Sequence, residues 1–132
     1  MTVDRLTDFA ERYTSAWCSQ DPAQVASFFS PQGSLRVNQG ALARGREEIA
    51  AVARSFMTAF PDLKVMLERV SQEGPYGFYH WSLTGTNDGP GGSGRSVHIH
   101  GFEQWTFGDD GLIIESLGHF DEAEYARQIH GG

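Results

Sequence analysis

The chain has 132 residues, a formal net charge of −7 and a pI near 5.1. This length suits one domain, spanning residues 1–132, that buries its own hydrophobic core. The ten Lys and Arg residues are scattered, which argues against the basic stripe of a nucleic-acid-binding protein. No apolar run reaches the roughly 20 residues of a membrane span, the N-terminal segment lacks an apolar signal-peptide core, and the single cysteine, Cys18, allows no internal disulfide. We therefore expect a cytoplasmic protein without nucleic-acid or membrane partners.

The first 60 residues predict helices joined by short turns. Apolar residues at spacings of three and four predict a helix over residues 3–19, with a stripe formed by Val3, Leu6, Ala10, Tyr13 and Trp17. Asp21 and Pro22 are suited to begin a second, short helix, as its N-cap and its first residue. Residues 30–33 predict a turn, and residues 35–43 a small hairpin. A third helix is expected from Gly45 to the residue before Pro61.

After Pro61 the period of the apolar residues changes to that of strands. We expect strands at 63–70 and 76–86, a glycine-rich loop at 87–94, and a hairpin of 96–107 with 112–121 around an Asp-Gly turn. A closing helix is expected at 121–129. Helices first and neighbouring strands afterwards predict an α+β fold, in which the helices cover one face of a mainly antiparallel sheet and leave a pocket.

Glu103 is the most informative residue of this predicted sheet. Strand side chains alternate, so Glu103 shares a face with Ile99, Trp105 and Phe107, which are apolar. A charge in such surroundings costs several kcal/mol unless it is paired or hydrated. Burial disfavours the charged form and so tunes a carboxyl towards proton transfer near neutral pH. Glu103 is therefore a candidate acid or base, and the alternative is a structural carboxylate bonded to Tyr13 or to a Trp indole.

The opposite face of the same strand carries histidines. His98 and His100 lie two residues apart, and His80 lies on the similar face of the neighbouring strand. Imidazoles at this spacing can bind a metal, but no Cys or carboxylate spacing supports a site, so we expect no metal. Since the helices take the other side, we expect this mixed face, which includes Gln104, to form a homodimer. His119 is expected either beside His80 or beside the aspartate described next.

Several short motifs occur in a characteristic order. They are Asp-Pro at 21–22, Gly-Arg-Glu-Glu-Ile at 45–49, Ala-Phe-Pro-Asp-Leu at 59–63, Gly-Thr-Asn-Asp-Gly at 85–89 and His-Phe-Asp at 119–121. In this order they resemble the SnoaL-like polyketide cyclases over most of residues 5–130. The resemblance implies the cone-shaped α+β fold shared with ketosteroid isomerases and nuclear transport factor two. It also implies a ring-closing aldol condensation that needs no cofactor or metal and uses a pocket aspartate as acid or base.

By its position ahead of the closing helix, Asp121 resembles that aspartate, although a helix N-cap is an equally ordinary use of Asp. Asn87 stands where the family often has His, and it is a candidate hydrogen-bond donor to a substrate oxygen at the pocket mouth. Turn formation is the alternative for Asn87. The expected substrate wall is aromatic, and its alternative is ordinary core packing; its candidates are Tyr13, Trp17, Phe28, Phe56, Trp81 and Trp105.

Three functions are consistent with these features. The first is a small cofactor-independent cyclase or isomerase that moves a proton next to a carbonyl of a hydrophobic, oxygenated small molecule, with an indole N–H or Asn87 stabilising the developing oxyanion. The second is a ligand-binding module of the same fold without turnover. The third is a protein-interaction module that uses only the outer sheet face. A second polar group converging on the pocket with Glu103 would favour the enzyme.

Overall fold

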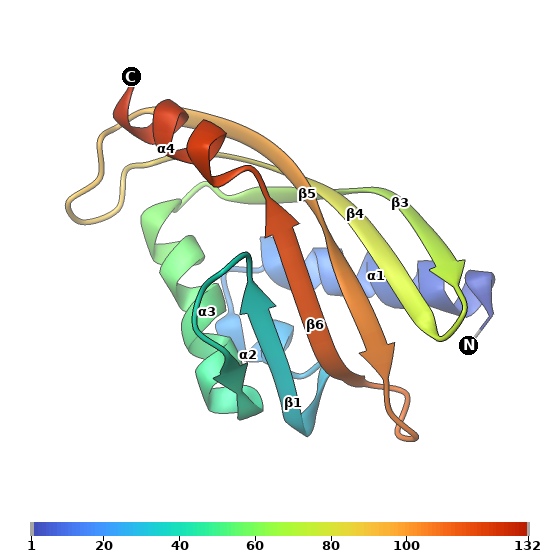
Figure 1. Ribbon diagram of the computed structural model, residues 1–132. Helices are drawn as coiled ribbons and strands as arrows, with labels where there is room; N and C mark the ends of the chain where they lie inside the picture. Colours follow the sequence, from blue (N-terminus) through green and yellow to red (C-terminus); the bar gives the residue numbers. More distant parts are fainter. Residues whose placement is uncertain (1, 132) are drawn as a thin grey trace.

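The structure is a computed structural model that describes residues 2–131. Its centre is a six-stranded, curved and unclosed sheet with the strand order β2-β1-β6-β5-β4-β3, and Figure 1 shows α1, α2 and α3 behind this sheet. The helices are α1 (Val3–Cys18), α2 (Pro22–Ala26), α3 (Gly45–Ala59) and α4 (Glu122–His130). The strands are β1 (Phe29–Val37), β2 (Ala43–Arg44), β3 (Lys64–Glu73), β4 (Tyr76–Thr86), β5 (Ser96–Phe107) and β6 (Ile113–Phe120). This arrangement confirms the expected α+β fold.

Helix α1 carries the apolar stripe of the N-terminal segment onto the sheet. Thr2 caps the helix, since its hydroxyl oxygen accepts a hydrogen bond of 3.2 Å from the backbone N–H of Arg5. Leu6 and Tyr13 are fully buried, and Trp17 is nearly so. The helix packs against β3, while α3 packs against β1. Tyr13 and Trp17 therefore lie over the inner face of the sheet.

The strand register sets which side chains meet on the inner face. From β3 to β6 the pairing is antiparallel, and Glu103 on β5 lies opposite Tyr79 on β4 and Gly118 on β6. β1 is antiparallel to β2 but parallel to β6, where Leu35 lies opposite Ser116. Because paired residues of neighbouring strands point to the same side, the inner face gathers residues from β1, β4, β5 and β6 around Glu103.

Two sequence expectations are wrong at their boundaries. Residues 30–33 do not form a free turn, because β1 continues through them from Phe29 to Val37 with a register shift against β6 between Phe29 and Ser34. The bulge absorbs Pro31 and Gly33 while the flanking residues keep their sheet hydrogen bonds. β3 also runs on to Glu73, so the turn to β4 contains only residues 74–75.

Helix α4 lies across one end of the sheet (Figure 1). The side-chain amide of Gln128 bonds both backbone groups of His98 on β5, accepting from its N–H at 2.6 Å and donating to its carbonyl at 3.0 Å. The ring of Tyr125 packs edge-on against Phe120 and Phe60. No helix within residues 2–131 is long and apolar enough to cross a membrane.

Candidate active site

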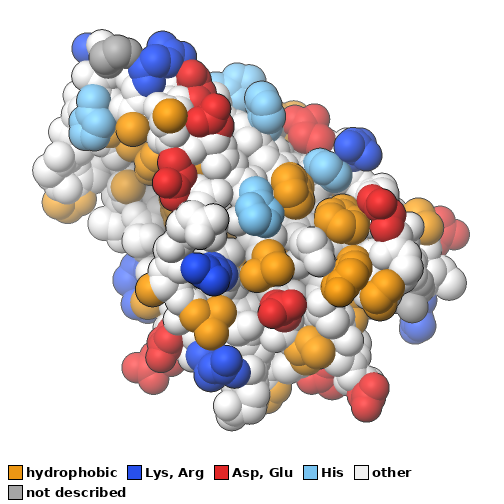
Figure 2. Space-filling view, in the orientation of Figure 1, with side chains coloured by type: hydrophobic (Ala, Val, Ile, Leu, Met, Phe, Trp, Pro, Cys, Tyr) orange, Lys and Arg blue, Asp and Glu red, His pale blue; other side chains and the backbone are white. Residues whose placement is uncertain are grey.

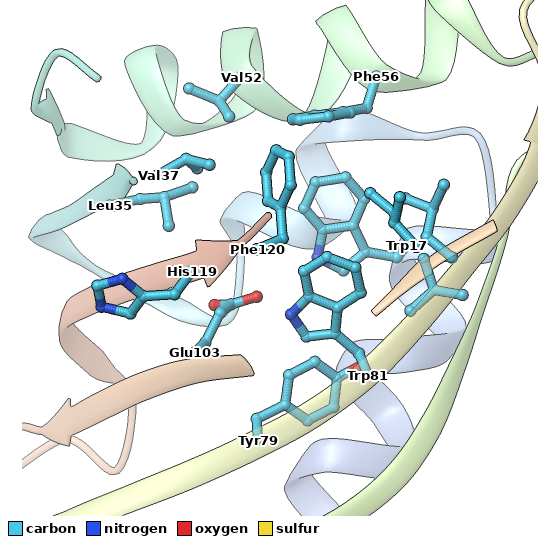
Figure 3. A pocket seen from close by; sticks show the side chains of 14 residues that line it. Trp17, Leu35, Val37, Val52, Phe56, Tyr79, Trp81, Glu103, His119 and Phe120 are labelled. Carbon is cyan, nitrogen blue, oxygen red and sulfur yellow. The ribbon is translucent and has the colours of Figure 1, made fainter. Parts of the chain in front are cut away.

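A cavity of about 60 Å³ lies between the inner face of the sheet and helices α1 and α3 (Figure 3). A buried water needs roughly 10–15 Å³ by the same measure, so the space suits a few waters or one end of a small molecule. Its wall combines aliphatic side chains from β1, α3, β3, β4 and β5 with aromatic ones. The aromatic side chains that line it are Trp17, Phe56, Tyr79, Trp81 and Phe120. Trp17, Phe56 and Trp81 were expected there from the sequence.

Glu103 is the one carboxylate among the described residues that line this cavity. Its side chain is 7% exposed and accepts hydrogen bonds from three donors. The Tyr13 hydroxyl lies 3.0 Å from Oε1 and 3.1 Å from Oε2. The Trp105 indole N–H and the Ser116 hydroxyl both donate to Oε1, at 2.9 and 2.7 Å. The carboxyl group is thus hydrogen-bonded in the core and at the same time faces the cavity.

The surroundings of Glu103 favour its neutral form. Burial raises the pKa of Glu103 above its ordinary value, although the hydrogen bonds from Ser116, Trp105 and Tyr13 lower it in part. Burial, followed by the nearby Glu103, also raises the pKa of Tyr13, and burial raises that of Tyr79. Both phenols therefore keep their protons at neutral pH. Tyr13 is then available as a donor to Glu103, and the Tyr79 hydroxyl bonds Thr14 at 2.6 Å.

A second polar group faces the same space. Figure 3 shows the indole nitrogen of Trp81 on the edge of the ring that points towards Glu103. Trp81 lies in the cavity wall and is partly exposed. An indole nitrogen can only donate. The cavity therefore offers a carboxyl group and an indole N–H donor within an otherwise largely apolar wall.

Other expected site residues lie outside the cavity wall. Tyr13 and Trp105 stand behind the carboxyl group, as its hydrogen-bond donors, so the predicted alternative for Glu103 is also realised. Phe28 packs edge-on against Phe9 and Tyr13, with ring centroids 5.2 and 5.6 Å apart. Asn87 is buried in the 87–94 loop, where its side chain accepts from the N–H of Ser93 at 2.8 Å.

Asp121 is exposed and caps α4, since its Oδ1 accepts from the backbone N–H of Glu124 at 3.0 Å. It follows Phe120, which lines the cavity, but Asp121 itself is not part of the wall. Its role as acid or base remains a prediction, and it requires a ligand that extends past Phe120. His119 reaches the wall beside Gly118, although much of its side chain is exposed and its ring lies 4.9 Å from that of Phe102.

Ser116 was not expected as a site residue. It is fully buried, and it donates the shortest hydrogen bond that Glu103 accepts. The same alternation that placed Glu103 on the inner face of β5 applies to β6, where Ser116, Gly118 and Phe120 share the inner face. The signal in the sequence is a hydroxyl side chain at position 116 on an otherwise apolar strand face.

The outer face of the sheet carries the histidines. His80 and His119 flank Phe102, with ring centroids 5.7 and 4.9 Å from its ring. Figure 2 shows histidine and hydrophobic side chains side by side on this face. Within residues 2–131 no group of three or more His, Cys, Asp or Glu side chains is arranged to hold a metal ion.

Gly101 allows the aromatic wall to close beside Glu103. A Cβ at this position would lie 2.2 Å from the carbonyl oxygen of His119 and 2.8 Å from the Trp81 ring. At Gly118, on the same inner face, the nearest atom would be 3.6 Å away, which is ordinary contact. We expect Gly101→Ala to destabilise the fold by about 1 to 3 kcal/mol through overpacking, and Gly118→Ala to have little effect. Urea unfolding of both variants measures the difference, and equal stabilities would contradict this packing.

The solved structures most useful for comparison share this fold at low sequence identity. A Streptomyces laurentii protein, TsrD, superposes with a TM-score of 0.83 at 22% identity, covering 98% of this chain and 97% of that one. A Jannaschia sp. CCS1 protein named for its likeness to SnoaL-like polyketide cyclases gives 0.78 at 24%, covering 96% and 94%. A Catenulispora acidiphila protein with a ketosteroid isomerase-like fold, solved with trimethylamine, gives 0.82 at 14%, covering 93% and 92%.

Comparison with curated proteins finds no match. The family model of the SnoaL-like polyketide cyclases, however, matches residues 7–129. That span contains both the cavity and all three donors to Glu103. The chain therefore belongs to the SnoaL-like polyketide cyclase family.

Proposed function

We propose that this protein is a small cofactor-independent enzyme of the cyclase or isomerase type, which moves a proton next to a carbonyl group of a hydrophobic small molecule. The observation that supports this most is the Glu103 carboxyl group, buried yet facing an apolar cavity. Membership of the cyclase family agrees with it. Burial raises the pKa of the Glu103 carboxyl group above its ordinary value, and a general acid or base works best when its pKa lies near the working pH.

In the proposed step, ionised Glu103 takes a proton from the carbon next to the carbonyl. The C–H bond electrons form the enolate, and the carbonyl oxygen gains the negative charge. The Trp81 N–H is placed to donate to that oxygen (Figure 3), and such donors in a dry site stabilise the developing charge. In ring closure the enolate carbon attacks a second carbonyl, and the alkoxide that forms takes the proton back from Glu103; in isomerisation the enolate takes that proton back at another carbon. Neither route needs a metal or a cofactor.

The cavity wall favours an uncharged ligand. None of the described residues that line it is Lys or Arg, and Glu103 is its only acidic residue. An anionic ligand would lose its hydration without gaining a partner there. The volume of about 60 Å³ suits the reacting end of the ligand, with the remainder extending past Phe120. In this arrangement Asp121 is the candidate for a second acid or base.

Hydrogen–deuterium exchange tests the proposal without knowledge of the natural substrate. Neutral cyclic ketones and β-diketones are incubated with the protein in D₂O, and NMR follows loss of the protons next to the carbonyl. Faster exchange with the wild type than with Glu103→Gln supports proton transfer by Glu103. Native mass spectrometry of the freshly purified protein, searching for retained small molecules, supplies ligands for a second round. Equal rates for both proteins across ketones that demonstrably bind would overturn the proposal.

A binding module without turnover is the second candidate. The observation that favours it is the hydrogen-bonding of Glu103, because Tyr13, Trp105 and Ser116 together satisfy Oε1 as they would in a structural carboxylate. A compound that binds in the cavity but shows no Glu103-dependent exchange, with Oε2 unused in the complex, would favour this function.

We also propose that the protein forms a homodimer through the outer sheet face. The face combines the partly buried rings of Phe78 and Phe102 with His80 and His119 (Figure 2), and α1, α2 and α3 lie on the other side of the sheet (Figure 1). Exposed patches of this kind in a compact protein commonly mark an interface. The symmetric contact of two identical faces would bury these rings without any further element.

Phe102→Glu is expected to convert this dimer to a monomer, because two like charges would face each other across the symmetry axis in a desolvated contact. Light scattering at neutral pH measures the mass. We also expect association to weaken as the pH falls from 8 towards 5, since a protonated imidazole at His80 would place a charge in the contact. Burial, and then Arg69, lower the pKa of His80, so its neutral form prevails at neutral pH. A monomeric wild type at pH 8 would contradict the proposed interface.

A further inference from the structure

We infer that Ser116 is a positioning residue that holds the Glu103 carboxyl group in one orientation. In this orientation Oε1 accepts hydrogen bonds from buried side chains, and Oε2 points to the ligand. This inference rests on the proposed function, because it assigns the oxygen that would exchange the proton. The two oxygens of the Glu103 carboxyl group have unequal surroundings, and this inequality assigns their roles.

The two carboxyl oxygens of Glu103 are hydrogen-bonded unequally. Oε1 receives the Ser116 hydroxyl at 2.7 Å, the Trp105 indole at 2.9 Å and the Tyr13 hydroxyl at 3.0 Å. Oε2 accepts only from the Tyr13 hydroxyl, at 3.1 Å, and shares that single proton with Oε1. A carboxylate oxygen offers about two lone-pair sites, so Oε1 is fully used. Oε2 keeps the capacity to accept from, or donate to, a bound molecule.

The donors reach Oε1 from different parts of the fold. Tyr13 lies on α1, Trp105 on β5 and Ser116 on β6, and all three are completely buried or nearly so. Trp105 is two residues from Glu103 on the same strand face, so it moves with it. Ser116 is opposite Trp105 on the neighbouring strand, and its hydroxyl makes no other hydrogen bond within residues 2–131. Ser116 therefore ties the carboxyl group to β6.

Removing the Ser116 hydroxyl has a defined consequence. A hydrogen bond to a charged acceptor favours the charged form, so its loss makes Glu103 a stronger base towards protons and frees the carboxyl group to rotate. The titratable groups beside Glu103 are Tyr13 from α1 and Tyr79 from β4, while His119 borders the cavity with its ring against Phe102 on the outer face. Both tyrosines stay neutral over the pH range in which carboxyl groups titrate. The ¹³C signal of the Glu103 carboxyl carbon therefore reports the titration of Glu103, and the ring signals of His119 are followed separately.

The experiment follows the side-chain carboxyl ¹³C signal of Glu103 against pH in the wild type and in Ser116→Ala. The signal is assigned by its loss in Glu103→Gln. We expect the proton affinity of Glu103 to rise by about tenfold or more in Ser116→Ala, as expected for a lost hydrogen bond to a charged group. Ser116→Cys, which keeps a weak donor of similar size, should give a smaller rise. It also serves if Ser116→Ala fails to fold.

Ser82→Ala is the matched control, because Ser82 is also a buried serine on a central strand but donates no hydrogen bond to Glu103. It should leave the Glu103 titration unchanged. An unchanged titration in both Ser116 variants would overturn the positioning role, even if Glu103-dependent exchange were observed. A raised proton affinity without any exchange activity would leave the positioning role standing and count against the enzyme instead.

Discussion

Glu103→Gln is expected to slow proton exchange by roughly 10² to 10⁴, the usual contribution of a general acid or base. The amide keeps the shape of the carboxyl group, and its oxygen can still accept from Ser116, Trp105 and Tyr13. It cannot take up and release a proton at neutral pH. The exchange rate with a bound ketone in D₂O, compared between the two proteins at equal occupancy, measures the loss.

The stability of Glu103→Gln relative to the wild type is expected to increase as the pH rises. Glu103 has a pKa in the folded state that burial raises above its ordinary value of 4.5. Between these two values the folded protein holds a proton that the unfolded chain has released, so wild-type stability falls as pH rises through this window. Glu103→Gln lacks this dependence. The variant should therefore gain stability relative to the wild type between pH 4.5 and pH 8.

Thermal melts at pH 4.5 and pH 8 measure this gain and need no substrate. A Glu103→Gln protein that is less stable by about 1 to 3 kcal/mol at both pH values would show that the carboxylate is chiefly structural, because the amide then leaves partners poorly satisfied. Such a result would move the search for the acid or base to Asp121.

Glu103→Leu is expected to be far more destabilising than Glu103→Gln. Within residues 2–131 it removes the acceptor to which the side chains of Tyr13, Trp105 and Ser116 all donate, in the core. Each buried donor left unpaired costs about 1 to 3 kcal/mol, and the added apolar contact of leucine offsets part of this. We expect a net loss of about 3 kcal/mol, or on the order of 10 °C in Tm.

Glu115→Leu is the matched control for this change. Glu115 lies on β6, next to Ser116, but it is exposed, and substitutions at such positions usually change stability by less than about 0.5 kcal/mol. Differential scanning calorimetry of both leucine variants gives the comparison. If Glu103→Leu were as stable as Glu103→Gln, the three donors would not depend on the carboxyl group, and its burial would have no structural justification.

The central part of the site was predictable because strand alternation is a local property. The position of Glu103 on the apolar face of residues 96–107 followed from that alternation, and its two possible partners, Tyr13 and an indole, both turned out to bond it. Ser116 lay on the corresponding face of the next strand and was accessible to the same reasoning. The fold followed from the order of several motifs rather than from any one of them.

Other features depend on contacts that a sequence does not display. Pro31 and Gly33 are local signals for a turn, but pairing with β6 keeps their segment in the sheet as a bulge. Asn87 has the residue type of a ligand donor, yet its side-chain oxygen accepts from Ser93 in its own loop and its amide N–H donates to the Ala59 carbonyl at the end of α3. Which aromatic side chains line the cavity, and which stand behind Glu103, depends on how α1 lies across the sheet.

The parallel pairing of β1 with β6 has a consequence for how the protein folds. It joins residues 29–37 to residues 113–118, so the sheet cannot be completed until β6 has left the ribosome. Pairings so distant in sequence make loop closure costly and folding slow. The antiparallel β3–β4–β5 meander can form earlier, with its inner face exposed. We expect a nascent chain that ends before residue 113 to retain this meander as an aggregation-prone intermediate. Strand β6 then converts it into the native protein, because it pairs with both β1 and β5 and supplies Ser116.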